Sequence, residues 1–102
     1  MRTTYVANYK MKNKLRRIFN KYDIIKIYQN DKVNFDEYDP EINEIVNGFN
    51  KFMNKSEFLK KVHLVFIRMF GKDIAGNRNK YKKLSDEVYV YVKNHQSKTG
   101  GM

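Results

Sequence analysis

The 102-residue sequence contains no cysteine, no tryptophan, one proline and five glycines. Without cysteine, disulfide bonds, thiolate metal ligands and thiol chemistry are excluded, and the chain is compatible with a reducing compartment. A long apolar run is also missing, because the densest stretch, Val62–Phe70, is interrupted by His63 and Arg68 and is far shorter than a membrane span. The basic residues near the N-terminus are not typical of a secretory signal. These absences predict a cytoplasmic protein with no transmembrane segment.

Acidic residues are scarce outside the middle of the chain. Residues 1–29 hold eight basic residues and one acidic residue. Residues 30–57 hold three basic and seven acidic residues, and residues 58–102 hold ten basic and three acidic residues. The net charge of the chain is +10. A surface with this distribution attracts polyanions or an acidic partner. Apolar residues still make up 41% of the chain. That content is sufficient for one folded core, so we expect a single domain.

Apolar residues recur at helical spacing in most of the chain. The spacing predicts helices over residues 8–22, 40–54, 57–70 and 78–94, with a short helical or extended connector near 24–28. Val88–Val92 alternates as a strand would, but the longer helical period that begins at Tyr81 favours a helix. The sequence therefore predicts an all-α fold: a compact bundle of about four helices in a single helical domain, 1–94, followed by a flexible C-terminal tail, 95–102.

Several residues mark the ends of these helices. Asp39 is expected to cap the helix that follows, with Pro40 at its first position, and Ser56 is expected to cap the next helix. That third helix is expected to end at Gly71. Its apolar residues cover almost half of its circumference, which is typical of a central helix with several neighbours.

Three short pieces of sequence resemble the motifs of a known family. They are Tyr22–Asp23, Phe35–Ile42 followed by Ile45, and Phe70–Asp73. Together they are similar to domain of unknown function 1871, a family of short, all-helical bacterial proteins, over roughly residues 14–92. The family has a proline where this chain has Ile24, and its members are less basic. The resemblance implies a helical fold and a cytoplasmic location, and it carries over no catalytic residue.

Six acidic residues lie in one loop and at the start of the predicted second helix. They are Asp31, Asp36, Glu37, Asp39, Glu41 and Glu44. Plain helix capping and solvation is the favoured interpretation. The main functional alternative is a docking surface for a basic partner protein, and a divalent-metal site is a weaker one. A calcium-binding loop is excluded because Val33 and Phe35 stand where ligands are needed.

Two groups of basic residues form the candidate binding face. They are Lys10, Lys14, Arg17 and Lys21 in the first helix, and Arg78, Lys80, Lys82 and Lys83 before and within the last. Such residues bind phosphates without reading sequence. Exposed tyrosines among Tyr5, Tyr9, Tyr28 and Tyr89 would add base stacking. No helix-turn-helix is recognisable, and basic composition alone is the competing interpretation.

Catalysis is not predicted. His63 lies at the edge of an apolar stripe and is expected to be a half-buried packing residue, since no partner or phosphate loop accompanies it. We expect no cofactor and no metal. The leading hypothesis is a non-enzymatic protein-binding module of the accessory, inhibitor or immunity type. The alternative is a sequence-independent nucleic-acid-binding protein. Membrane-surface binding by the first helix and a small helical enzyme rank lower.

Overall fold

The computed structural model describes residues 9–100 and is helical for most of that length. The elements in chain order are α1 (Tyr9–Tyr22), α2 (Asp31–Asn34), α3 (Asp39–Asn47), α4 (Lys55–Phe70), α5 (Lys72–Ala75), the 3₁₀ turn η2 (Arg78–Tyr81) and α6 (Lys82–Gly100). No β-strand occurs among the described residues. The predicted all-α class is therefore confirmed. The ambiguous segment 88–92 is helical, because it lies within α6.

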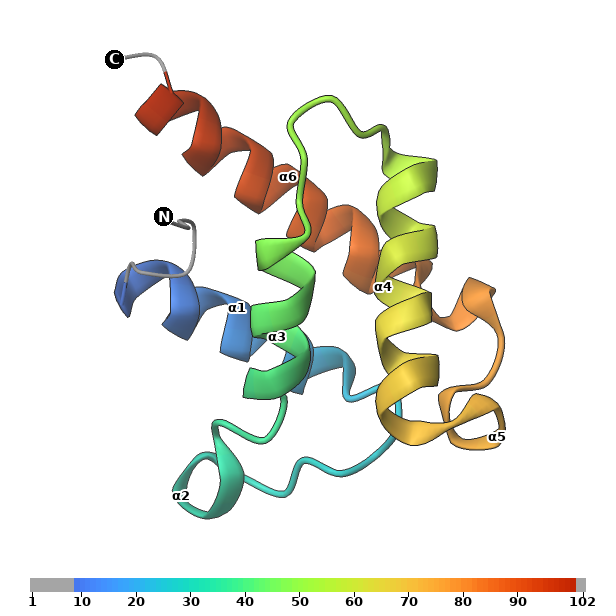
Figure 1. The fold of residues 1–102 in the computed structure, drawn as a ribbon. Helices are drawn as coiled ribbons and strands as arrows, with labels where there is room; N and C mark the ends of the chain where they lie inside the picture. The colour runs from blue at the N-terminus through green and yellow to red at the C-terminus, as the bar shows by residue number, and fades with distance from the viewer. Residues whose placement is uncertain (1–8, 101–102) are drawn as a thin grey trace.

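Each of the four longer helices, α1, α3, α4 and α6, packs against two of the others (Figure 1). α1 packs against α3 and α6, and α4 packs against α3 and α6. The start of α1 and the end of α6 lie on the same side of the molecule, so these two helices run in opposite directions. α4 also contacts α5 and η2, which confirms the predicted central position of this helix.

Aromatic side chains fill the core in two clusters. Phe19, Tyr38 and Phe66 join α1, α3 and α4, with ring centroids 6.0–6.3 Å apart. The second cluster consists of Phe49, Phe58 and Tyr89, with centroids 5.7–6.0 Å apart. Such pairs add about 0.5–1.5 kcal/mol each beyond the burial of their area. The aromatic content therefore builds the core of this small domain.

The helix predicted over 40–54 is too long. α3 ends at Asn47, and Gly48 forms its C-cap. Phe49 then turns back into the core, and the Asn50 side chain accepts a 2.8 Å hydrogen bond from the backbone N–H of Phe52. Phe49 continues the buried stripe of α3, but Phe52, the next residue at helical spacing, is 83% exposed, so the helical period does not extend beyond Phe49.

Two predicted caps are also wrong. The Asp39 side chain does not cap α3, because its carboxylate accepts a 2.7 Å hydrogen bond from Arg16 of α1 instead. Pro40 lies in the first turn of α3 as expected. Ser56 does not cap α4: Asn54 accepts from the N–H of Glu57, and Glu57 accepts from the N–H of Asn54, at 2.8 and 2.9 Å. This capping box starts α4 earlier than predicted.

The connector near 24–28 is not helical. It is organised by Asp23, which has a positive φ of 42° directly after α1. One Asp23 carboxylate oxygen accepts hydrogen bonds from the backbone N–H groups of Ile27 and Tyr28, both 3.0 Å, and from the Tyr38 hydroxyl at 2.6 Å. A single side chain thus replaces the hydrogen bonds that a helix or strand would supply.

The last helix differs from its prediction at both ends. Residues 78–81 form the separate turn η2, and α6 continues through Gly100. Residues 95–100 are therefore helical where the sequence analysis predicted a flexible tail; residues 101–102 lie outside the described part. Neither proline nor glycine occurs between Lys82 and Thr99, so no residue in that segment interrupts the backbone hydrogen bonds.

Candidate functional site

All eight residues of the predicted basic face are exposed. Lys21 forms an ion pair with Glu87 at 2.9 Å, and Lys82 forms one with Asp86 at 3.3 Å. The other six form no ion pair with any carboxylate in the described part of the chain. They are Lys10, Lys14, Arg17, Arg78, Lys80 and Lys83. Most of the predicted basic face is therefore not neutralised by the acids of the fold.

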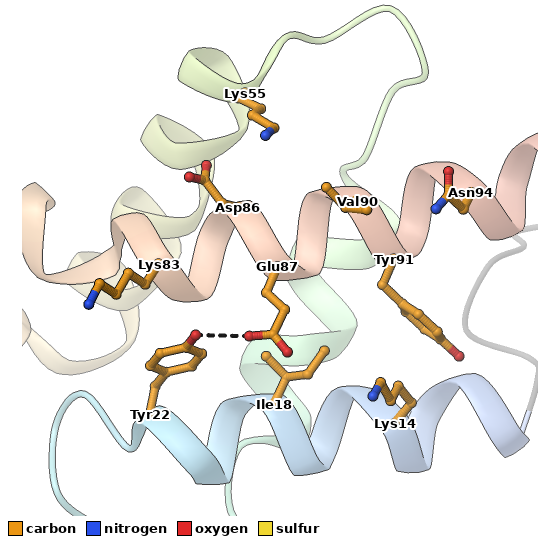
Figure 2. A pocket seen from close by; sticks show the side chains of 10 residues that line it. All are labelled: Lys14, Ile18, Tyr22, Lys55, Lys83, Asp86, Glu87, Val90, Tyr91 and Asn94. Carbon is orange, nitrogen blue, oxygen red and sulfur yellow. Dashed lines mark hydrogen bonds between the residues drawn. The ribbon is translucent and has the colours of Figure 1, made fainter.

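One residue of each basic group lines an open groove beside α6. Because α1 and α6 are antiparallel neighbours, Lys14 from one and Lys83 from the other line the same space of about 590 Å³. We call it the α1–α6 groove. Its lining residues are Lys14, Ile18, Tyr22, Lys55, Lys83, Asp86, Glu87, Val90, Tyr91 and Asn94. Figure 2 shows Lys83 toward the Tyr22 end of the groove, Lys14 toward the Tyr91 end, and Lys55 reaching in from α4.

Four of the ten lining residues of the groove are apolar or aromatic. Ile18 is buried, Tyr22 and Tyr91 are half-buried, and Val90 is 45% exposed. The two helices present these residues at helical spacing, Ile18 and Tyr22 four apart on α1 and Val90 and Tyr91 adjacent on α6. Figure 2 shows Val90 on the side of α6 turned away from α1, beside Tyr91, where it offers exposed apolar area.

Glu87 lies at the centre of the groove but is already engaged. The Tyr22 hydroxyl donates to it at 2.8 Å and the Lys21 ammonium group donates at 2.9 Å. The hydrogen bond from Lys21 lowers the pKa of the Glu87 carboxyl group, and the bond to Glu87 raises the pKa of Tyr22. Glu87 therefore stays charged and paired at neutral pH.

The groove carries an excess of positive charge. Its two acids, Asp86 and Glu87, are paired with Lys82 and Lys21, neither of which lines the groove. The three lining lysines, Lys14, Lys55 and Lys83, form no ion pair with a described residue. The groove is therefore suited to an anionic ligand, and its apolar side chains to one that also has apolar groups.

The predicted acidic docking surface is divided by the fold. Asp31, Asp36 and Glu37 are exposed around α2. Asp39 is half-buried against Arg16 and Lys12, at 2.7 and 3.7 Å. Glu44 pairs with Arg68 at 2.7 Å. Glu41 is only 4% exposed. The six residues therefore do not form one open surface.

Glu41 is the unexpected member of this group. One of its carboxylate oxygens is buried without a hydrogen-bond partner. Burial raises the pKa of the Glu41 carboxyl group, and the nearby charges of Glu37 and Asp39 add to the rise. The sequence contains no signal for this burial, because an acid at a helix start is ordinarily a solvated residue that the helix dipole favours.

The remaining candidates have structural roles. His63 is half-buried, with Nε2 2.8 Å from the Gly76 carbonyl oxygen and its ring 5.4 Å from that of Tyr81, as expected of a packing residue. Tyr89 is buried and donates a 2.7 Å hydrogen bond to the Met53 carbonyl oxygen, so it is not available for base stacking. Tyr28 is half-buried and donates to Asp31. Tyr5 and the Tyr9 side chain lie outside the described part.

Of the ten residues that line the groove, only Lys14 and Lys83 belong to the predicted basic face. Lys55, Val90 and Tyr91 were not recognised as sharing one site with Lys14 and Lys83. The basic residues gave a signal, but their convergence depends on which helices become neighbours. A lysine at the start of α4 gives no sign that it faces α6.

Comparison with known protein families, curated proteins and solved structures found no match for the chain. The resemblance to domain of unknown function 1871 stays a prediction. Of the described helices, none has the length and apolar character needed to span a bilayer. Within the described residues, His, Asp and Glu side chains form no group of three or more suited to a metal ion.

Proposed function

We propose that the chain is a small, non-enzymatic protein-binding module that takes an acidic partner protein on its basic surface. The observation that supports this proposal most is that Lys14, Lys55 and Lys83 line one groove together with the apolar and aromatic side chains of Ile18, Tyr22, Val90 and Tyr91. Phosphate backbones need only the cations, whereas a protein surface contributes both carboxylates and apolar side chains. We also propose a cytoplasmic location, with which the lack of cysteine is consistent.

Electrostatic complementarity is the expected source of specificity. The unpaired cations lie on α1, α4, η2 and α6, so an acidic partner would approach a broad positive field before any close contact forms. Rim charges of this kind mainly raise the association rate, and that effect weakens as salt screens them.

The alternative is sequence-independent binding of nucleic acid by the same cations. It is favoured by six exposed basic residues without carboxylate partners in the described chain. It is disfavoured by the burial of Tyr89, which removes one of the proposed stacking residues.

Direct binding titrations with two labelled probes separate the two proposed functions. The probes are a fluorescent acidic amphipathic peptide, made of Glu with Leu at helical spacing, and a fluorescent DNA duplex. Both are titrated with the protein at about 50 mM and about 200 mM salt. The proposal predicts tighter binding of the peptide, with an apolar part of the affinity that survives the higher salt. Tighter binding of the duplex, with an affinity that collapses at the higher salt, would contradict it and support the alternative.

A further inference from the structure

The α1–α6 groove combines three features that a simple charged surface does not have. It is bounded by two antiparallel helices, its lining includes the exposed Val90 on the outer side of α6, and its unpaired lysines come from three different helices. We infer that this groove seats one α-helix of the partner, with an apolar side facing Val90 and acidic side chains facing the lysines. This inference rests on the proposed function and names the part of the surface where the partner protein binds.

The dimensions suit a helix. On α1, Lys14, Ile18 and Tyr22 follow one another at intervals of four residues, a line of about 12 Å at the helical rise of about 1.5 Å per residue. On α6 the lining runs from Lys83 to Asn94, about 16 Å by the same rise. The groove therefore offers two to three turns of contact. A groove between antiparallel helices is also where helical bundles place a further helix.

The charges specify the chemistry of that helix. Lys14, Lys55 and Lys83 line the groove while both lining acids are already paired. Their aliphatic stems can lie along an apolar strip while the ammonium groups reach acidic residues on its flanks. A basic helix would leave the same lysines facing like charge, which is unfavourable. The complementary ligand is therefore an acidic amphipathic helix.

A second exposed apolar residue provides a matched control. Leu64 lies on α4, is 54% exposed and belongs to a separate depression with Lys61 and Arg68. Arg68 there is engaged by Glu44 at 2.7 Å. A charged residue at Leu64 therefore tests the effect of charge on an exposed helix position outside the groove.

The test uses the full chain and the acidic Glu/Leu peptide, with binding followed by fluorescence anisotropy. Val90→Glu should weaken binding about tenfold, since it removes apolar contact and adds like charge, whereas Leu64→Glu should change it less than about twofold. Lys83→Glu should likewise weaken binding more than Lys60→Glu, which changes an exposed lysine of α4 outside the groove. Circular dichroism and thermal unfolding of each variant identify any loss of folding.

The outcomes separate the two proposals. Equal effects of the groove and control substitutions, with peptide binding retained, would overturn the groove as the site and leave an acidic partner elsewhere on the surface. Failure of the unaltered protein to bind the peptide at low salt would overturn both. Tighter, Val90-dependent binding to vesicles of anionic phospholipid than to the peptide would overturn the helical partner in favour of a membrane surface.

Discussion

The Tyr22 hydroxyl, at the end of α1, donates a 2.8 Å hydrogen bond to Glu87 in the second turn of α6. This contact joins segments that are far apart in the sequence and lies in the centre of the α1–α6 groove (Figure 2). Lys21 binds the same carboxylate at 2.9 Å. The contact therefore fixes the two helices that form the groove and neutralises the acid that would otherwise repel an acidic ligand.

Glu87→Gln should separate the effect of Glu87 on stability from the effect of its charge on ligand binding. The lowered pKa of Glu87 means that its stabilising contribution is present at neutral pH and is lost as pH falls through the folded-state pKa. The variant should therefore have a lower free energy of unfolding at neutral pH, and the deficit should shrink in acid. At the same time it should bind the acidic Glu/Leu peptide about threefold more tightly, because a negative charge leaves the groove.

Asp73→Asn is the control for that experiment, since Asp73 is an exposed acid of α5 outside the groove. It makes the same change in net charge. Equal gains in affinity for the two variants, measured by anisotropy at one salt concentration, would show that total charge rather than the groove controls binding.

Tyr38→Phe should be destabilising without affecting the groove. The Tyr38 side chain is 1% exposed, and its hydroxyl donates a 2.6 Å hydrogen bond to Asp23. Burial and this bond raise the pKa of Tyr38, so the hydroxyl remains a donor at all moderate pH values. Loss of a buried bond to a carboxylate should cost about 1–3 kcal/mol in urea unfolding, whereas Tyr28→Phe, at a more exposed tyrosine, should cost less than about 0.5 kcal/mol. Equal costs would contradict the organising role of Asp23.

Glu41→Gln should stabilise the protein at neutral pH. Burial raises the folded-state pKa of Glu41, so its charged form is less favourable in the folded chain than in the unfolded chain. That penalty is absent below the ordinary value of 4.5 and grows as pH rises through the folded-state pKa. Urea unfolding at neutral and acidic pH should show a stability gain that disappears in acid. Asp73→Asn, at an exposed acid of α5 that does not contribute to the pKa of Glu41, should show no such gain; a gain independent of pH would contradict the assignment.

Two glycines should respond differently to alanine. Gly71 has a φ of +88° and a ψ of 157° and no atom near the position of an added Cβ, so Gly71→Ala tests backbone strain alone and should cost about 1–3 kcal/mol. Gly48 has a negative φ of −89°, and an added Cβ would clash with the flexible end of Lys61 and make an ordinary contact with the Glu44 carbonyl oxygen, at 3.4 Å. Because the Lys61 side chain can move, Gly48→Ala should change the free energy of unfolding by less than about 0.5 kcal/mol. Thermal unfolding of both variants compares them, and a larger loss at Gly48 would contradict the account.

Local chemistry explains which features could be predicted from the sequence. Pro40 and Gly71 mark helix ends because their backbone restrictions act within one or two residues. The end of α3 was missed because Phe52 has the spacing of a buried helical position but lies 83% exposed in the turn that follows Phe49.

In the candidate site, too, some features follow from the local sequence and others depend on the packing of distant segments. Exposure of the eight basic residues follows from their positions on helix surfaces, whereas their role as a binding face stays a prediction. The convergence of Lys14 and Lys83 with Lys55 and Val90 follows from the packing of α1, α4 and α6, which helical periodicity does not specify. The burial of Glu41 likewise depends on neighbours from outside its own helix.

The most direct test of the central claim is a nuclear magnetic resonance titration of the isotope-labelled protein with the acidic Glu/Leu peptide. The account predicts that the largest chemical-shift changes fall on the groove, at Ile18, Tyr22, Val90 and Tyr91. Residues at the distant α2 turn, such as Val33, should change little. Changes concentrated on Arg78 and Lys80, or spread evenly over all exposed lysines, would contradict a docking groove between α1 and α6.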